Sequence, residues 1–211
     1  MLKLFAIFSI MLISLTILPN SFAREPIVKI STDKEIYYYG DYLTFTIEVS
    51  KITNDLASLY LTDENGKKSS AIPYPISQKI ITETFPFPFD PIIYPEGKWT
   101  FEIVYSDITA STEFYLKDSG KIVIATWIKD IGRLWVDGHI TDSEFVSKGI
   151  GELIKNELID IPNIESSDLG KDSKIPNWIK TTTKWWVDGL ISDNDFGLGI
   201  EHLIKRGVII V

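Results

Sequence analysis

Apolar and polar residues alternate along the first half of the chain. In residues 42–49 an apolar side chain stands at every second position from Leu43 to Val49, separated by threonines and a glutamate. A period of two is typical of a half-buried β-strand. Further short runs of this kind lie at residues 58–62, 79–85, 99–105 and 109–116. With turn signals between them, about seven short strands predict an antiparallel β-sandwich over residues 24–117.

The second half of the chain repeats itself. Trp127-Ile128-Lys129 returns as Trp178-Ile179-Lys180, and Trp135-Val136-Asp137-Gly138 returns as Trp186-Val187-Asp188-Gly189, at an offset of 51 residues. From Gly149 onward the offset is 50, because the first copy holds one extra residue. Duplication of a small aromatic unit favours a packing or interaction module over a catalytic site, which needs one unique constellation of residues.

Each copy predicts a helix, a tight turn and a second helix. In the first copy Gly138 suits the left-handed position after a helix end, and Thr141 with Glu144 forms a capping box for the next helix. The predicted units are repeat 1 over residues 121–161, a polar linker over 162–174, and repeat 2 over 175–211.

One hairpin of this size buries too little apolar surface to be stable alone, so we expect the two hairpins to pack on each other. Large apolar residues that recur in both copies are expected to form their core. These residues are Trp127, Trp135, Ile140, Phe145, Leu153, Trp178, Trp186, Ile191, Phe196 and Leu203.

The opening of the predicted sandwich resembles that of bacterial and archaeal surface immunoglobulin-like domains. Thr32-Asp33-Lys34 and Tyr39-Gly40-Asp41 precede the alternating strand, and Trp99 takes the aromatic corner position that is usually Tyr. The resemblance implies an immunoglobulin-like fold and no particular function. The predicted fold class is therefore an all-β immunoglobulin-like sandwich followed by a small all-α domain of two repeated helical hairpins.

The repeat resembles one found at the C-termini of exported proteins of ammonia-oxidising archaea. The residues that carry the resemblance run from Ile175-Pro176-Asn177-Trp178-Ile179-Lys180, through Trp185-Trp186 and Phe196, to Ile210. The first copy departs from the pattern, with Leu134 in place of the first Trp of the pair. This family has no assigned biochemical activity, so the resemblance implies a cell-surface context and no chemistry.

The N-terminus predicts export. Lys3 is followed by an apolar run to about Leu18 and by Ser21-Phe22-Ala23, which together indicate a signal peptide over residues 1–23 with cleavage after Ala23. The alternative is an uncleaved anchor, the one route by which we expect contact with a membrane. The protein is then extracellular or on the cell surface, where a chain with no cysteine must hold its fold by burial alone.

The composition and motifs predict a protein that is not an enzyme. The formal net charge is −8 with no basic patch, which argues against nucleic acid as a partner. The chain has only two His and no phosphate loop, zinc-protease motif or catalytic triad pattern. The interaction candidates are aromatic: Phe87 and Phe89 as a binding tip or a cap over the sandwich, and Trp185 as a surface ring or a contact to the other repeat.

The turn of each repeat resembles the second half of a calcium-binding EF-hand loop. Calcium needs six to eight oxygen ligands, and the first half of each loop does not supply them, since Arg133 and Trp135 stand at two of the ligand positions. We therefore expect no metal and no cofactor. If a metal did bind, its ligands would come from Asp137, Asp142, Glu144, Asp188, Asp193 and Asp195.

Taken together, these patterns predict a non-catalytic exported or cell-surface protein. Its sandwich would act as a spacer or binding module, and its repeats would dock to an envelope partner, either a surface protein or a glycan. Two alternatives stay open: a calcium-dependent surface module and a secreted hydrolase.

Overall fold

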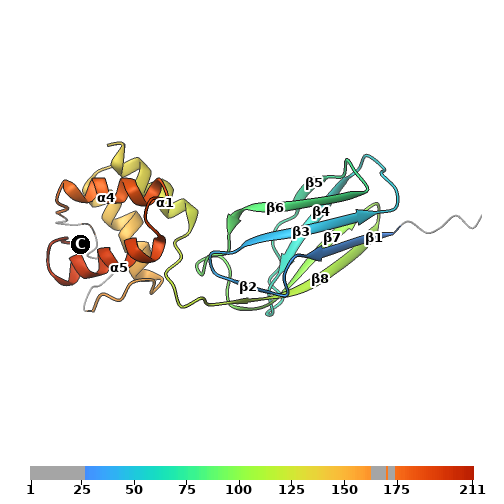
Figure 1. The fold of residues 1–211 in the computed structure, drawn as a ribbon, viewed down its shortest axis with the longest axis horizontal. Helices are drawn as coiled ribbons and strands as arrows, with labels where there is room; N and C mark the ends of the chain where they lie inside the picture. The colour runs from blue at the N-terminus through green and yellow to red at the C-terminus, as the bar shows by residue number, and fades with distance from the viewer. Residues whose placement is uncertain (1–26, 163–169, 171–173) are drawn as a thin grey trace, which may run out of the picture.

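A computed structural model describes residues 27–162, 170 and 174–211. The predicted signal peptide lies outside these residues, as does most of the predicted linker. The molecule is elongated, with strands gathered at one end and helices at the other (Figure 1). No helix within the described ranges is long and apolar enough to cross a membrane.

The strands form two sheets. They are β1 (Val28–Thr32), β2 (Ile36–Tyr38), β3 (Tyr42–Val49), β4 (Leu56–Thr62), β5 (Ile72–Pro75), β6 (Ile80–Pro88), β7 (Gly97–Tyr105) and β8 (Ile108–Lys117). One sheet has the order β1-β3-β6, and the other has the order β2-β8-β7-β4-β5. The strand predicted at residues 42–49 is confirmed as β3, whose alternate residues from Leu43 to Val49 are buried. The shorter strands β1, β2 and β5 also alternate between more and less buried residues.

The predicted fold class, an all-β immunoglobulin-like sandwich followed by a small all-α domain of two repeated helical hairpins, is wrong. The chain is 27% helical and 33% strand, and one sheet curls into a half barrel, which makes a mixed α/β fold. β2 pairs parallel to β8, and Lys174 forms an isolated antiparallel bridge with Ile210 at the helical end. Ile92 and Ile122, next to the strands, pack against the helical core.

The reason for this error is physical. Hydrophobic periodicity predicts elements one at a time, whereas pairing between distant segments decides how those elements combine. The parallel pairing of β2 depends on its contact with β8, which lies about 80 residues further along the chain.

The helical segments are α1 (Thr126–Val136), α2 (Asp142–Phe145), the π-helix η1 (Val146–Ile150), α3 (Gly151–Lys155), α4 (Trp178–Val187) and α5 (Asp193–Lys205). The segments α2, η1 and α3 follow one another without a break. The extra residue of the first repeat falls in this stretch, at η1. A π-helix turn is the usual way for a helix to absorb one inserted residue. The matching helix of the second repeat, α5, is α-helical throughout.

The predicted turn signals are confirmed. Thr141 and Glu144 form the complete capping box at the start of α2, and Ser192 caps α5 through the backbone N–H of Asp195. Gly138 and Gly189 have φ of 78° and 75°, a backbone conformation that side chains with a Cβ rarely adopt. The repeated sequence therefore builds the same turn twice.

In each repeat one buried tryptophan ring stacks on one phenylalanine ring. Trp135 stacks on Phe145 with ring centroids 4.2 Å apart, and Trp186 stacks on Phe196 at 4.0 Å, both pairs nearly parallel. Trp135 is 0% exposed and Trp186 is 1% exposed. The stacking explains why both copies of the repeat have a tryptophan and a phenylalanine at these equivalent positions.

The two repeats meet along α1 and α4, and their contacts are reciprocal. Lys129 of the first repeat lies 5.8 Å from the ring centre of Trp186, and Lys180 of the second lies 5.2 Å from that of Trp135. A Cβ on Gly132 would stand 2.8 Å from the Trp186 ring, so the helices approach as closely as glycine allows. Each repeat thus completes the other, as their small size predicts.

Candidate functional site

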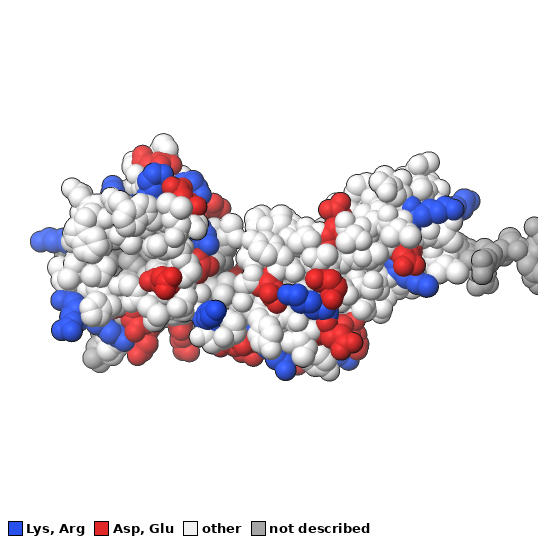
Figure 2. All heavy atoms as spheres, in the orientation of Figure 1, with Lys and Arg blue, Asp and Glu red and all other residues white. Residues whose placement is uncertain are grey.

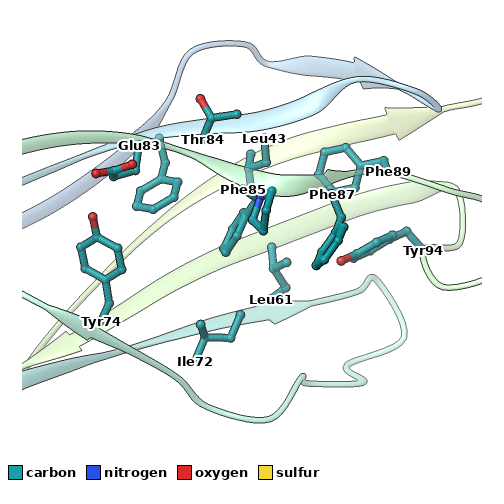
Figure 3. A pocket seen from close by; sticks show the side chains of 12 residues that line it. Leu43, Leu61, Ile72, Tyr74, Glu83, Thr84, Phe85, Phe87, Phe89 and Tyr94 are labelled. Atoms are coloured by element: carbon teal, nitrogen blue, oxygen red, sulfur yellow. The ribbon is translucent and has the colours of Figure 1, made fainter. Parts of the chain in front are cut away.

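An apolar cleft opens between the two sheets at the edge strands β5 and β6 (Figure 3). Its volume is about 420 Å³, within the range of pockets that hold small molecules. It is lined by Leu43, Phe45, Leu61, Ile72, Tyr74, Glu83, Thr84, Phe85, Pro86, Phe87, Phe89 and Tyr94. Most of these side chains are aliphatic or aromatic, so the cleft offers an apolar ligand a large contact area.

Prolines border the cleft on both sides. Pro73 and Pro75 stand two residues apart in β5, and Pro86 and Pro88 stand two residues apart in β6. Prolines at this spacing remove N–H groups from the same side of a strand, and in sheets they are tolerated where that side faces solvent. Another strand cannot easily pair with such an edge. The gap between the sheets therefore stays open to other kinds of ligand.

Side chains from both edges face each other across the cleft. Phe85 and Phe87 come from β6, while Ile72 and Tyr74 come from β5 (Figure 3). The ring of Phe45 lies beneath them, 5.3 Å from that of Phe85 and 5.9 Å from that of Tyr74. Phe45 is 2% exposed, so this floor belongs to the rigid core of the sheets.

A few polar groups mark one end of the cleft, where Tyr74, Glu83 and Thr84 lie (Figure 3). Burial raises the pKa of the Tyr74 hydroxyl, and the negative charge of Glu83 raises it further. The phenol therefore stays protonated at neutral pH and can donate a hydrogen bond. One donor and one carboxylate can orient a ligand, but they do not form a nucleophile with its base.

The two phenylalanines predicted as interaction candidates differ in exposure. Phe87 is 61% exposed at the mouth of the cleft. Phe89 is 3% exposed, because its ring packs against Tyr37 at 5.5 Å and Phe114 at 5.5 Å. The sequence predicts Pro-rich residues 85–91 to be an edge or a loop, and their first part is indeed the edge strand β6. Of the two predicted alternatives, a binding tip or a cap over the sandwich, the burial of Phe89 on the inner wall of the cleft excludes the binding tip for this residue.

The exposed tryptophans lie on the helical end. Trp185 is 48% exposed on α4, so its ring is accessible. Trp127 and Trp178, predicted as repeat core, are 37% and 53% exposed, and that prediction is wrong. They stand at the first turn of α1 and at the start of α4, where an α-helix turns the ring away from the contact between the two repeats.

The other residues predicted to form the repeat core lie inside or at its margin. Phe145, Leu153 and Phe196 are buried. Ile140, Ile191 and Leu203 are partly buried and pack against the same cluster.

Most of the candidate metal ligands are held by protein donors. Asp142 and Asp193 each accept the indole N–H of the tryptophan seven residues earlier, at 2.8 Å in both copies. Asp193 also pairs with Lys129 at 2.7 Å, and Asp188 pairs with Lys184 at 2.6 Å. Glu144 completes the cap of α2. Among the residues that the structure describes, no group of three or more His, Asp or Glu side chains could hold a metal ion.

The sequence analysis missed the opposite wall of the cleft. Ile72 and Tyr74 lie in a strand of four residues that alternation alone does not reveal. The signal that could have found them is the repeated Pro spacing, since Ile72-Pro73-Tyr74-Pro75 has the same apolar-Pro alternation as Phe85-Pro86-Phe87-Pro88. Two such runs indicate two edge strands with apolar side chains between prolines.

Comparison with known proteins identifies no family. No protein-family model matches the chain, and no curated protein does. Among solved structures, the sulfur carrier protein SoxY from Chlorobium limicola f thiosulfatophilum is similar over 44% of this chain and 78% of that one. Its sequence identity is 8% and its TM-score is 0.26, values too low to support any conclusion about this chain.

Proposed function

We propose that this is a non-catalytic exported or cell-surface binding protein, which takes an uncharged apolar molecule into the cleft between β5 and β6. The observation that carries the proposal is an open apolar cleft whose two edges are lined with prolines. A peptide strand needs backbone N–H donors that the prolines of these edges remove, whereas a hydrocarbon or aromatic ligand needs none.

The helical end is proposed to dock to an envelope partner, either a surface protein or a glycan. Trp185 is half exposed on α4, and aromatic rings at a surface are the side chains that most often anchor a partner. On the face shown in Figure 2, Lys and Arg side chains are interspersed with Asp and Glu. A polyanion such as nucleic acid finds no continuous basic surface on that face.

The cleft can be tested with an uncharged naphthylamine dye that fluoresces in apolar surroundings. The wild-type chain should bind it saturably, and Ile72→Asp should weaken binding by about tenfold or more, because a charge in the cleft must be desolvated by the ligand. Ile80→Asp is the matched control, since Ile80 is 62% exposed on β6 and does not line the cleft. Equal dye binding by wild type and Ile72→Asp would disprove the site.

Docking by the helical end can be tested in cells with the full chain. We expect Trp185→Ala to lower the fraction of protein that stays with the envelope after cell fractionation, because an exposed aromatic anchor is lost. Leu198→Ala is the control, since Leu198 is 51% exposed on α5. Unchanged retention of Trp185→Ala would contradict docking through α4.

A further inference from the structure

A second hollow lies where the strand-rich end meets α1, and we call it the junction pocket. Its volume is about 210 Å³. It is lined by Phe87, Asp90, Ile93, Tyr94, Thr126, Trp127 and Asp130. It therefore joins residues that the sequence places in separate modules. It shares Phe87 and Tyr94 with the cleft and differs from it because α1 forms one of its walls.

Three aromatic rings line the junction pocket. Phe87 and Trp127 are 61% and 37% exposed, so a ligand can reach both of them. Tyr94 is the third ring, and it is fixed by edge contacts to Phe89 and Trp99. The faces of aromatic rings carry partial negative charge, which attracts cations.

Two carboxylates accompany the rings. Asp90 is 4% exposed, and its Oδ1 accepts the backbone N–H groups of Ile92 and Ile93 at 3.0 Å each, which hold it in place. Asp130 is exposed on α1. No Lys, Arg or His of the described residues lines the pocket. Its lining therefore combines aromatic faces with negative charge and favours a cationic ligand.

The kind of cation follows from the hydrogen-bonding groups. Asp130 and the second carboxylate oxygen of Asp90 can accept N–H groups from a primary ammonium, but the three rings offer a cation only their faces. A methylated ammonium needs no acceptor and gains from contact with aromatic faces. We propose that the junction pocket binds a small, free organic cation with a trimethylammonium group, of the choline type, between its three rings and beside its two carboxylates.

The proposal is tested by calorimetric titration of the full chain with choline chloride at low ionic strength. We expect saturable binding that weakens with added salt, because part of the attraction is electrostatic. The neutral tert-butyl analogue of choline has the same shape and should bind about tenfold more weakly or worse. Equal binding of the analogue, or no binding of choline, would overturn the proposal. Phosphatidylcholine vesicles should not bind, and binding to them instead of choline would point to a lipid surface and contradict a free cation.

Variants separate this pocket from the cleft and from the other exposed rings. Trp127→Ala should weaken choline binding about tenfold, and Asp130→Asn should weaken it and reduce its salt dependence. Trp178→Ala is the control, because Trp178 is the equivalent exposed residue of the second repeat and lies outside the pocket. Ile72→Asp should impair dye binding in the cleft and leave choline binding unchanged. Loss of choline binding in Trp178→Ala, or full binding in Trp127→Ala, would refute the site.

Discussion

The two helical repeats share a motif and differ in one helix. In the second repeat, α5 is α-helical from Asp193 to Lys205. In the first, one extra residue lies between Phe145 and Gly149, and the helix widens there into η1. An inserted residue in an α-helix would rotate the following face by about 100°. The wider turn absorbs that rotation, because Ile150 and its counterpart Ile200 are both buried, at 1% and 2% exposure.

The interface between the repeats shows a second difference. Gly132 on α1 and Thr183 on α4 occupy equivalent positions, and both lie where the two helices approach. Gly132 leaves room for Trp186, while Thr183 is fully buried with a hydroxyl that has no hydrogen-bond partner among the described residues. The duplicated positions are therefore complementary in size, and the repeats cannot be exchanged for each other without cost.

The largest effect is expected when the shared core is broken. Trp135→Ala and Trp186→Ala should each lower the free energy of unfolding by about 3–5 kcal/mol, because each leaves a large cavity beside a stacked phenylalanine. Urea denaturation measures the loss. Trp178→Ala serves as the control and should cost less than about 1 kcal/mol, since that ring is half exposed. A similar loss in all three variants would show that the stacked pairs are not special.

The difference between Gly132 and Thr183 at the α1–α4 interface can be tested with one variant at each position. Gly132→Ala should destabilise the protein by about 1–3 kcal/mol, because the new Cβ meets the Trp186 ring. Thr183→Val should stabilise it by about 1 kcal/mol, because it removes a buried hydroxyl without a partner and keeps the shape. The exposed Thr181→Val is the control on α4. Thermal unfolding of the three variants measures whether each change raises or lowers the stability. A loss of stability in Thr183→Val would contradict the conclusion that its buried hydroxyl lacks a hydrogen-bond partner.

The caps of α2 and α5 should contribute unequally. Glu144→Ala should cost about 1 kcal/mol and Asp195→Ala somewhat less, because Glu144 accepts the backbone N–H of its N-cap residue, Thr141, whereas Asp195 accepts only the hydroxyl of Ser192 among the described contacts. Chemical denaturation of both variants measures the difference. A larger loss of stability in Asp195→Ala than in Glu144→Ala would contradict this ranking of the two caps.

The capping box also predicts a pH dependence. Hydrogen bonding from the backbone N–H of Thr141 lowers the pKa of Glu144 below its usual value. A lowered pKa in the folded state stabilises the protein above the ordinary glutamate pKa, and this contribution is lost as pH falls through the folded-state value. The stability difference between wild type and Glu144→Gln should therefore shrink when denaturation is repeated in acid, and a difference that grows in acid would contradict it.

The smallest effect is expected from removing the insertion. Deletion of Lys148 gives the first repeat the spacing of the second, and we expect an uninterrupted α-helix with a stability change of less than about 1 kcal/mol. The exposed ion pair of Lys148 with Glu144 contributes little to this balance. The pattern of short amide–amide contacts in NMR spectra distinguishes an α-helix from a π-helix. Unfolding of the deletion variant would show that the first repeat depends on η1.

Much of the local structure could be predicted from the sequence. The alternation of residues 42–49 located β3, and the duplicated Gly and capping residues located the turns at Gly138 and Gly189. The one-residue change of offset marked the place of η1 but not its form. These features depend on neighbours within a few residues, so a local pattern is enough to specify them.

The sequence by itself therefore determined the longer elements, the duplication and the aromatic content of the chain, while the short strand β5 escaped it. Only the tertiary structure decided that β2 joins β8 in parallel, that Phe89 is buried while Trp127 and Trp178 are exposed, and that the β5 and β6 edges leave a cleft between them. It also decided that Phe87 and Trp127 share the junction pocket. The physical reason is that burial and pairing depend on contacts between residues far apart in the chain, which no local period records.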